Sequence, residues 1–429
     1  QNKMKFCQRC VYPENHPLYL LLDEKGICSG CRVHEEKDSL DWSLREEDLI
    51  QTLELYKNRD DSFYDCIIPV LGDGDSFFVV DQLKYKYAMN PLLITYNIHF
   101  NTKIGIRNLA RLLSKTDCDH LMFTVSPETV KKVVRESLKN IGDIYWHITA
   151  GIQSFAVTVS KRLEIPLIVW GVNGWLDQVG QFSHEDSVEM TKKVWKEHNL
   201  RTWSPSDLIN EKEGLTEQMM KAFMYPEDDE LEQARTRGIY LGNYIRWDSQ
   251  IQIEKMIAKY GYETAKEERT FNRYETINCH HNSGVHDYIK FLKYGFGKVS
   301  DHVSRDIRLK RMTREEGVCL VEKYQIKKPS DLSLFLEWIE MNEEEFMEFI
   351  NLHRDLDIWE LNGGNEWNIK DSISNHLNDE WVEQARLEGT LDRREYLQTI
   401  SLEDPNNDDE YVLMGRSYMD ENDFRAVKG

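Results

Sequence analysis

The chain has 429 residues, of which 40% are apolar and 30% are charged, and its formal net charge is −21. This length and composition are typical of a globular protein with two or three domains. No stretch approaches the roughly 20 uninterrupted apolar residues that a membrane span requires, so we exclude membrane insertion. The acidic balance also argues against nucleic acid as a partner, because neutralising phosphates takes clustered Lys and Arg.

The N-terminal residues and the cysteine content indicate the compartment. No charged-then-apolar signal region precedes the first cysteines, so we expect a cytoplasmic protein. Eight cysteines are too few for a disulfide scaffold in a chain of this length, and four of them fall in two tight pairs.

Those two pairs each follow the spacing C-x2-C, and seventeen residues separate them. Each pair fits a turn that directs two thiolates at one ion, and two such turns complete a tetrahedral shell suited to zinc. A shell of four thiolates leaves no open coordination position. We therefore predict a structural Zn²⁺ site in an N-terminal zinc-ribbon module over residues 4–45, with the ligands Cys7, Cys10, Cys28 and Cys31.

Apolar runs alternate with helical patterns from residue 65 onward. The apolar runs lie at 66–71, 91–96, 120–125 and 165–170, and the helical patterns lie at 77–83, 104–113, 127–138 and 152–163. This alternation predicts an α/β domain over residues 46–210, with a parallel sheet that is covered by helices.

Strand signals fade after about residue 200, and helical patterns replace them. The helical patterns lie at 216–223, 227–237, 250–259, 285–293, 314–323 and 331–349. We therefore predict a mainly helical region over residues 211–358, which we assign to substrate or partner binding. An acidic C-terminal extension, 359–429, follows it.

The segment 69–76 joins the first apolar run to a helix. Backbone N–H groups at such a turn and at the helix N-terminus make an anion site. The segment lacks the G-K-[ST] of a Walker A loop, but it resembles the S-G-G-x-D-S loop of the PP-loop ATP pyrophosphatases. In this alignment Gly72 is the first glycine, Gly74 takes the variable position, and Asp75 and Ser76 form the final pair.

Two residues of the loop depart from that pattern. Leu71 replaces the serine, which removes a hydroxyl donor, and Asp73 replaces the second glycine. A carboxylate at Asp73 would repel bound phosphates unless a magnesium ion or a basic residue intervenes. The loop is therefore a degenerate form of the pattern.

Six segments outside the loop carry a resemblance to one family. They are CQRCVYPENHP at 7–17, GICSGCR at 26–32, NPLLITYN at 90–97, LDQVGQFSH at 176–184, YLGNYIRWD at 240–248 and DYIKFLKYG at 287–295. From Met4 to about Glu360 the chain resembles the N-acetyl sugar amidotransferases of the PP-loop superfamily, which are similar to enzymes that make acetamidino sugars for O-antigen and flagellin glycans. The resemblance implies a sheet of the PP-loop (adenine nucleotide alpha hydrolase-like) type.

The resemblance also implies a reaction, its cofactors and its partners. ATP with Mg²⁺ activates the oxygen of an N-acetyl amide on a sugar, ammonia displaces AMP, and an acetamidino group results. The ammonia would come from a separate glutaminase subunit through a cyclase-like barrel subunit. The residues agree with this, because no convincing glutaminase Cys/His pair is visible. Cys66 lies in an apolar run and Cys118 lies between two aspartates, which hinders thiolate formation.

The loop and the strand ends supply the predicted site. The phosphates of ATP would be held by Gly72, Asp73, Gly74, Asp75 and Ser76. Asp75 and Ser76 are also predicted to be catalytic, with Asp75 a magnesium ligand. Since open α/β sheets bind ligands at the carboxyl ends of strands, we expect the adenosine to contact Thr95, Tyr96, Asn97 and Gly171. Ordinary turn or strand-end packing is the alternative for each of these residues.

Three further groups have two interpretations each. His184 is predicted to be an acid/base residue, with a surface-charge cluster as the alternative. The basic run of Arg305, Arg308, Lys310, Arg311 and Arg314 suits a phosphate or carboxylate, or else a solvated helix face. For Cys279, His280 and His281 with His286 and Asp287, we favour substrate contact or structure over a metal site.

Two other functions stay open. A tRNA thiolase would share the zinc ribbon and the adenylation chemistry, although the acidic balance and the lack of a paired catalytic thiol count against it. A non-catalytic nucleotide-binding or scaffold subunit would explain Leu71 and Asp73 as marks of a loop that has lost ATP turnover.

Overall fold

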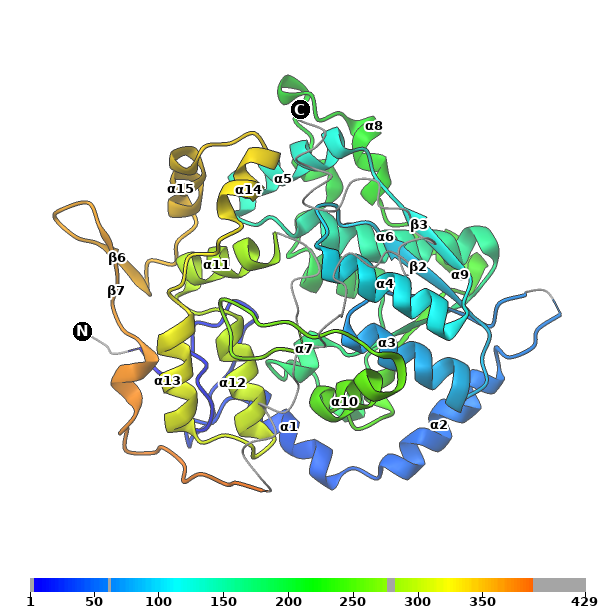
Figure 1. Cartoon of the computed structure of the whole chain (residues 1–429), viewed down its shortest axis with the longest axis horizontal. Coiled ribbons are helices and arrows are strands. Elements are labelled where there is room, and N and C mark those ends of the chain that lie inside the picture. Colours follow the sequence, from blue (N-terminus) through cyan, green and yellow to red (C-terminus); the bar gives the residue numbers. More distant parts are fainter. Residues whose placement is uncertain (1–3, 61–62, 276–281, 389–429) are drawn as a thin grey trace.

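The computed structural model describes residues 4–60, 63–275 and 282–388. A central sheet carries helices on both faces, and the N-terminal module lies beside the helices that follow the sheet in the chain (Figure 1). Within these ranges, no helix is both long enough and apolar enough to cross a lipid bilayer.

Five parallel strands form the central sheet, in the order β3–β2–β1–β4–β5. They are β1 Cys66–Pro69, β2 Pro91–Tyr96, β3 His120–Phe123, β4 Leu167–Trp170 and β5 Arg237–Tyr240. The first four coincide with the predicted apolar runs, so the predicted parallel α/β fold is confirmed. The order reverses direction beside β1, whose neighbours are β2 and β4. Ligands bind at such a switch point in open α/β sheets, outside the carboxyl ends of the strands.

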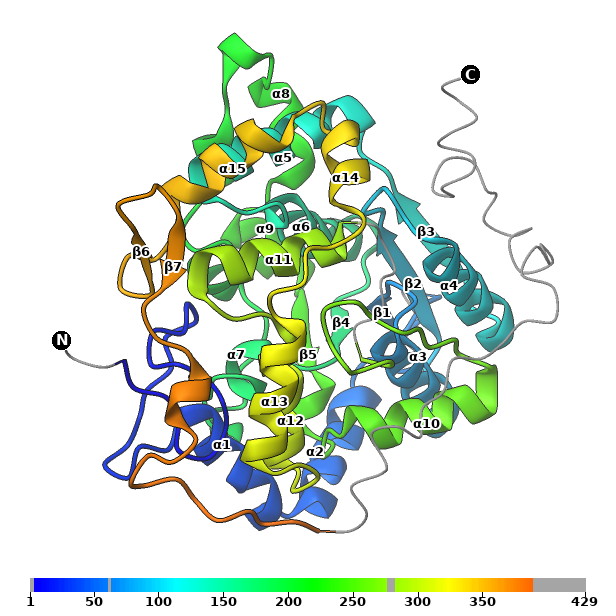
Figure 2. The ribbon, with the colours of Figure 1, turned by 60° about the vertical axis from the view of Figure 1, so that its left-hand side comes forward.

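The strands β1, β2, β4 and β5 are largely buried between helices, whereas the edge strand β3 is partly exposed. Ile67 of β1 and Ile168 of β4 pack against helices α5 Pro127–Ile141 and α6 Trp146–Leu163. The opposite face, with Ile68, packs against helices α3 Gly74–Asp81, α4 Lys103–Thr116 and α10 Ser249–Tyr260. Figure 2 shows α3 and α4 on one side of the strands and α6 on the other.

Local signals set the ends of these helices. The Thr102 hydroxyl accepts the Gly105 N–H at 3.2 Å and caps α4. Pro127 is the first residue of α5, and Gly142 ends that helix with a φ of +66°.

The N-terminal module contains two cysteine turns and two helices. Short antiparallel bridges, Phe6 to Pro13 and Leu22 to Cys28, close the turns. Helices α1 Ser29–Ser39 and α2 Trp42–Glu54 follow. The module packs against the short helix α7 Gly174–Asp177 after β4 and against α12 Lys298–Arg308.

Helices dominate the chain after β4, as predicted, although β5 lies among them. They are α8 Glu217–Met220, α9 Asp228–Ala234, α11 Ser283–Tyr294, α12, α13 Arg314–Tyr324, α14 Leu332–Trp338 and α15 Glu343–Leu352. An antiparallel pair, β6 Trp359–Leu361 and β7 Trp367–Ile369, comes after them.

Three details differ from the sequence prediction. The helix expected over 227–237 ends at Ala234, and the chain then enters β5. The helix expected over 331–349 is two helices, α14 and α15. Helix α12 was not predicted as a separate element. The domain boundaries at 45, 210 and 358 stay predictions.

The first part of the C-terminal extension returns to the N-terminal module. The Glu383 N–H donates to the Gln8 carbonyl at 3.1 Å, and the Glu388 N–H donates to the Lys310 carbonyl at 2.9 Å. Residues 371–388 therefore lie along the cysteine turns and the end of α12 (orange in Figure 1). The rest of the acidic extension, 389–429, lies outside the described residues.

Candidate functional site

The predicted phosphate loop lies between β1 and α3, and Gly72 sets its shape. Gly72 has a φ of +83°, a region that residues with a Cβ rarely adopt. A Cβ built there would lie 2.7 Å from the backbone N of Leu109 in α4. Only glycine fits this turn, so the first glycine of the predicted pattern has a structural reason.

Asp73 caps helix α3. Its Oδ1 accepts the Ser76 N–H at 3.0 Å and also the Ser76 hydroxyl proton. The Ser76 Oγ in turn accepts the Leu71 N–H at 3.1 Å. The Asp73 carboxylate thus takes the N-terminal amide of α3, which is the kind of donor that binds phosphate at a helix N-terminus.

A cavity of about 210 Å³ lies beside this loop, at the carboxyl ends of β1, β2 and β4. The loop contributes Leu71, Asp73, Asp75 and Ser76 to its lining. The remaining lining residues are Pro69, Val70, Val79, Ile94, Tyr96, Ile152, Phe155, Val169, Trp170, Gly171 and Val172. One part of the wall is therefore charged and polar, whereas the rest is largely apolar and aromatic, as in a pocket for a nucleotide.

Asp75 is the strongly perturbed acid of the loop. Burial raises the pKa of its carboxyl to about 7, the nearby Asp73 carboxylate adds to the rise, and the charge of Arg305 opposes it. The Oδ1 atom of Asp75 is buried and has no hydrogen-bond partner. Two carboxylates on one wall, one with an orphaned oxygen, suit the oxygen coordination of Mg²⁺.

A buried set of ion pairs lies behind Asp75 and joins three parts of the chain. Arg305 of α12 is 3.2 Å from Asp177 of α7, and Lys37 of α1 is 3.0 Å from the same carboxylate. Arg305 also pairs with Glu275. Burial raises the pKa of Asp177, but Lys37 and Arg305 outweigh it and hold that pKa below its ordinary value.

Four residues are predicted to contact adenosine. Of these, Tyr96 and Gly171 line the cavity, whereas Thr95 and Asn97 do not. The Thr95 hydroxyl donates to the Val70 carbonyl at 2.8 Å. The Asn97 Oδ1 accepts the His99 N–H at 3.0 Å, which fixes the turn after β2. Both residues therefore support the strand ends, and their contact with adenosine stays a prediction.

His184 also lies outside the cavity lining. Its ring is buried, its Nδ1 is 2.8 Å from Glu36 of α1, and it meets the Trp42 ring edge-on. Glu36 additionally accepts the backbone N–H of His184 at 2.8 Å. These contacts attach the loop after α7 to the N-terminal module, and the acid/base role of His184 stays a prediction.

The four predicted zinc ligands come together. The sulfur atoms of Cys7, Cys10, Cys28 and Cys31 lie within 4.8 Å of one another, and all four side chains are buried. The Cys7 sulfur accepts the N–H of Cys10 at 3.4 Å and that of Cys28 at 3.2 Å. Four converging thiols with N–H support form a donor set that fits a tetrahedral zinc ion.

Arg308 lies against this cluster. Its Nε is 3.3 Å from the Cys31 sulfur, and its Nη2 is 3.5 Å from the Cys28 sulfur. Burial alone would raise the pKa of Cys10, but the other cysteines and Arg308 outweigh it and lower that pKa. Cys10 is therefore favoured as a thiolate, the form that binds metal, whereas burial raises the pKa of Cys7 and Cys31.

Arg311 and Arg314 of the basic run are also buried, whereas Lys310 forms a surface pair with Glu388. Arg314 donates to the carbonyls of Cys10 at 3.1 Å and Cys7 at 3.2 Å. Arg311 forms a two-bond ion pair with Asp248, with one of the bonds at 3.1 Å. Neither the phosphate interpretation nor the solvated-face interpretation describes these arginines, which hold the cysteine turns and the start of α10.

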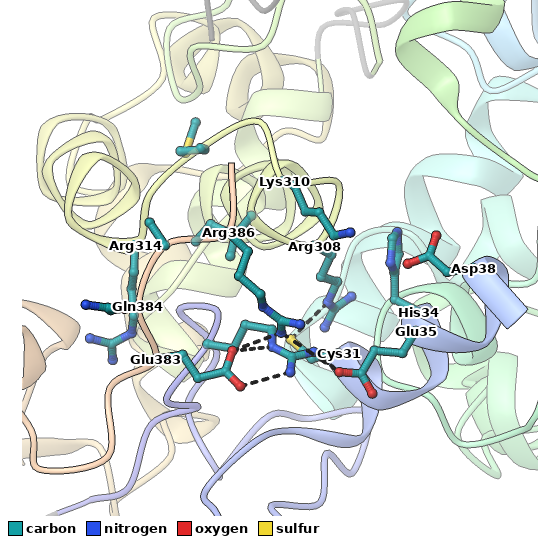
Figure 3. Close-up of a pocket in the computed structure, with 14 residues that line it drawn as sticks. Cys31, His34, Glu35, Asp38, Arg308, Lys310, Arg314, Glu383, Gln384 and Arg386 are labelled. Atoms are coloured by element: carbon teal, nitrogen blue, oxygen red, sulfur yellow. Dashed lines mark hydrogen bonds and ion pairs between the residues drawn. The ribbon is translucent and has the colours of Figure 1, made fainter. Parts of the chain in front are cut away.

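A second, smaller cavity of about 80 Å³ lies beside Cys31 and Arg308 (Figure 3). Arg9 crosses it, at 2.6 Å from Glu35 of α1 and 2.7 Å from Glu383 of the C-terminal segment. Arg386 pairs with the same Glu383 at 3.0 Å. The pairs of Glu383 with Arg9 and Arg386 thus attach the C-terminal segment to the module.

The predicted cluster around Cys279 is only partly described. Cys279, His280 and His281 lie outside the described residues. His286 stacks on Tyr145 with ring centroids 3.6 Å apart, whereas Asp287 pairs with Arg269 at 2.8 Å. His286 and Asp287 therefore face different partners.

Sequence reasoning missed several residues of the site. Ile152 and Phe155 line the cavity from α6, and Lys37 and Asp177 form the buried ion pair. The helical pattern at 152–163 placed the first two on a helix that packs on the sheet. No local signal pairs Lys37 with Asp177, which are far apart in the sequence.

Comparisons with known proteins identify one segment of the chain. Residues 268–373 match the family model of the LPS biosynthesis protein WbpG-like, C-terminal domain. No curated protein matches the chain. The match runs from before α11 to beyond β7 and fits the family that the sequence resembles.

Two solved structures are similar to this chain at low scores. An NH3-dependent NAD synthetase from Campylobacter jejuni subsp. jejuni is 12% identical, with a TM-score of 0.27, covering 46% of this chain and 93% of that chain. An NMN synthetase from Francisella tularensis is 11% identical, with a TM-score of 0.25, covering 51% of this chain and 87% of that chain. Likeness at these scores carries no conclusion about function.

Proposed function

We propose that this chain is an ATP-dependent, AMP-forming amidotransferase that converts the N-acetyl group of a bacterial sugar into an acetamidino group. The observation that carries the proposal is the cavity at the carboxyl ends of β1, β2 and β4, with the loop 71–76 on its wall. This is the position where open α/β sheets bind nucleotides. The match of residues 268–373 to an LPS biosynthesis family supports a sugar as the substrate to be modified.

The proposed reaction has two steps. The amide oxygen of the N-acetyl group attacks the α-phosphorus of ATP, and pyrophosphate leaves. Ammonia then attacks the activated carbon, and AMP leaves with the former amide oxygen. Each step needs charge stabilisation and a fixed geometry rather than a covalent bond to the protein.

Different residues of the cavity would bind the phosphates, the magnesium ion and the base. The backbone of the loop and Ser76 hold the phosphates, and Asp73 and Asp75 would hold Mg²⁺. When bound, that ion neutralises phosphate charge as the pyrophosphate departs. The ring of Tyr96 and the aliphatic side chains of Ile94 and Ile152 form the apolar wall for the base.

Ammonia would come from outside the chain. Burial raises the pKa of the Cys66 thiol well above its ordinary value, and it also raises the pKa of Cys118. Neither thiol therefore suits a glutaminase nucleophile, which works as a thiolate. We therefore propose a separate glutaminase as the ammonia source, with a cyclase-like barrel subunit as a second partner, in the cytoplasm. The four cysteines would bind a structural zinc that fixes the module carrying Lys37.

The direct test measures product formation by the zinc-loaded protein. Purified protein is incubated with magnesium, ATP, ammonium and a set of UDP-linked and free N-acetyl sugars, and AMP, pyrophosphate and sugar mass are followed. The proposal expects stoichiometric AMP, pyrophosphate and a sugar 1 Da lighter, because NH replaces O. AMP that appears only with tRNA and a sulfur donor would instead indicate a thiolase.

A second function has one observation in its favour. The Asp73 carboxylate already takes the Ser76 N–H, so the loop could bind nucleotide without turning it over, as a scaffold subunit. Nucleotide binding with no AMP release under any of these conditions would favour that function over the amidotransferase.

A further inference from the structure

Asp73 places a negative charge where the proposed nucleotide phosphates would lie. Its Oδ1 accepts the Ser76 N–H at 3.0 Å and the Ser76 hydroxyl proton, and the hydroxyl oxygen accepts the Leu71 N–H at 3.1 Å. Three donors of the loop are thereby used within the loop itself. An incoming phosphate must compete with a carboxylate that is covalently part of the site.

A second carboxylate makes this competition worse for a free nucleotide. Asp73 and Asp75 both line the 210 Å³ cavity. A triphosphate without a counter-ion would approach both of them at close range and be repelled. Arg305, whose positive charge acts on Asp75, is already paired with Asp177 at 3.2 Å and with Glu275.

A divalent cation removes both obstacles at once. The Asp75 Oδ1 is a buried oxygen with no hydrogen-bond partner, so it gives a cation one ready ligand. Rotation of the Asp73 side chain from Ser76 toward that cation would supply a second ligand. The same rotation releases the Ser76 N–H and hydroxyl for a phosphate oxygen.

We infer that Asp73 is a specificity-determining residue that makes the loop bind the magnesium complex of a nucleotide and reject the free nucleotide. The inference rests on the proposed function, because it assumes that the cavity takes a nucleotide. It goes further in assigning a use to the one residue that most alters the loop pattern. Until magnesium binds, the Asp73 carboxylate occupies the Ser76 N–H and hydroxyl, which a phosphate oxygen would otherwise accept.

The experiment compares wild-type protein with Asp73→Asn. Each is titrated with α,β-methylene-ATP in a calorimeter, once with excess magnesium and once without magnesium. Asparagine caps a helix about as well as aspartate but carries no charge, so the fold of the loop is kept. Chelators are avoided, so that zinc stays bound, and zinc content is measured in each sample. The readout is binding, which does not depend on turnover.

The wild type is expected to bind the analogue at least about 100-fold more weakly without magnesium than with it. The magnesium ratio is the dissociation constant without magnesium divided by that with magnesium. In Asp73→Asn this ratio should shrink by about tenfold or more, the factor that corresponds to 1.4 kcal/mol. The gain should appear as tighter binding of the magnesium-free analogue. Asp73→Gly, which restores the glycine of the pattern, should shrink the ratio further, because it also frees the Ser76 N–H.

A matched control is another aspartate cap. Asp41 caps α2 by accepting the N–H groups of Ser43 at 3.1 Å and Leu44 at 3.2 Å. Asp41→Asn must leave the magnesium ratio unchanged. An equal change in this variant would mean that capping or net charge, rather than the position of Asp73, produces the effect, and would overturn the inference.

The outcomes separate the inference from the proposed function. If all proteins bind the analogue with the same magnesium ratio, Asp73 does not select the complex, although the nucleotide site stands. If neither the wild type nor either Asp73 variant binds the analogue with magnesium present, the proposed function fails and the inference fails with it.

Discussion

Substitution of Gly72 by alanine tests the loop geometry on which the site depends. Gly72 has a φ of +83°, and a Cβ there would lie 2.7 Å from the backbone N and Cα of Leu109. The left-handed backbone costs about 1–2 kcal/mol for a residue with a Cβ. The overlap adds about 1–3 kcal/mol, because backbone atoms of α4 cannot rotate away as a side chain would. We expect Gly72→Ala to lower the free energy of unfolding by about 2–5 kcal/mol in sum.

The control is Gly174→Ala, at the start of α7. No heavy atom lies within 4 Å of a Cβ built at Gly174, so this variant should unfold within about 1 kcal/mol of the wild type. Both variants are measured by urea unfolding, followed by circular dichroism and by tryptophan fluorescence. Equal stability of Gly72→Ala and the wild type would refute the turn, and with it the assignment of the first glycine.

Three further predictions concern the metal site, the acid response and the buried ion pairs. Arg308→Gln removes two contacts to cysteine sulfur and should weaken zinc retention against a chromophoric chelator by about 10–100-fold. Burial lowers the pKa of His120 to about 4 and of His302 to about 3, so both stay neutral in the folded protein while the unfolded chain takes up protons below about pH 6.5. Stability from these two groups is therefore complete above pH 6.5 and falls toward pH 4.5 by about 3 kcal/mol per pH unit, measured by urea unfolding at each pH. Asp177→Asn leaves the Lys37 ammonium buried without its carboxylate and should cost about 3–5 kcal/mol of unfolding free energy.

Each of these predictions has a contrary result. Lys310→Gln breaks a surface pair with Glu388 and should leave zinc retention unchanged. If zinc retention falls equally in Lys310→Gln and Arg308→Gln, the contacts of Arg308 with sulfur do not explain the effect. His302→Asn should reduce the acid slope by about 1.4 kcal/mol per pH unit, the contribution of one histidine, and an unaltered slope would contradict the histidine explanation. If Asp177→Asn has nearly the same unfolding free energy as the wild type, other groups compensate the buried charges.

Much of the sheet could be predicted from the sequence because its inner strands are buried on both faces. Strands such as Pro91–Tyr96 are therefore continuous apolar runs, and such runs between helical patterns are a strong signal. Strand β5, Arg237–Tyr240, gave no such signal. It is four residues long, begins with Arg and Gly, and is held at the sheet edge by pairing with β4.

Helix α12 was missed although its sequence carries a partial signal. Its buried residues mix the apolar Val299 and Val303 with polar ones, which are Ser300, His302, Ser304, Asp306 and Arg308. Prediction of amphipathic helices depends on an apolar stripe. In α12 that stripe is narrow, because it consists of Val299, Val303 and Ile307 alone, and buried polar residues lie beside it.

The candidate site also contains some residues that the sequence predicts and others that only the fold reveals. The four cysteines were predicted because spacing alone identifies a zinc site, and their sulfur atoms do come together. The role of Asp73 as a cap depends on where its side chain turns, which the sequence does not encode locally. The contact of His184 with Glu36 joins residues 148 positions apart, so only the fold reveals it.

The central claim is that the cavity beside the loop binds a nucleotide. Its most direct test is equilibrium binding of magnesium α,β-methylene-ATP to zinc-loaded wild type, Gly171→Ala and Gly171→Phe. A Cβ at Gly171 meets its neighbours at 3.5 Å or more, so alanine should bind as the wild type does, whereas phenylalanine should fill the cavity and abolish binding. Binding that persists in folded Gly171→Phe, or no binding by any of the three proteins, would contradict the claim.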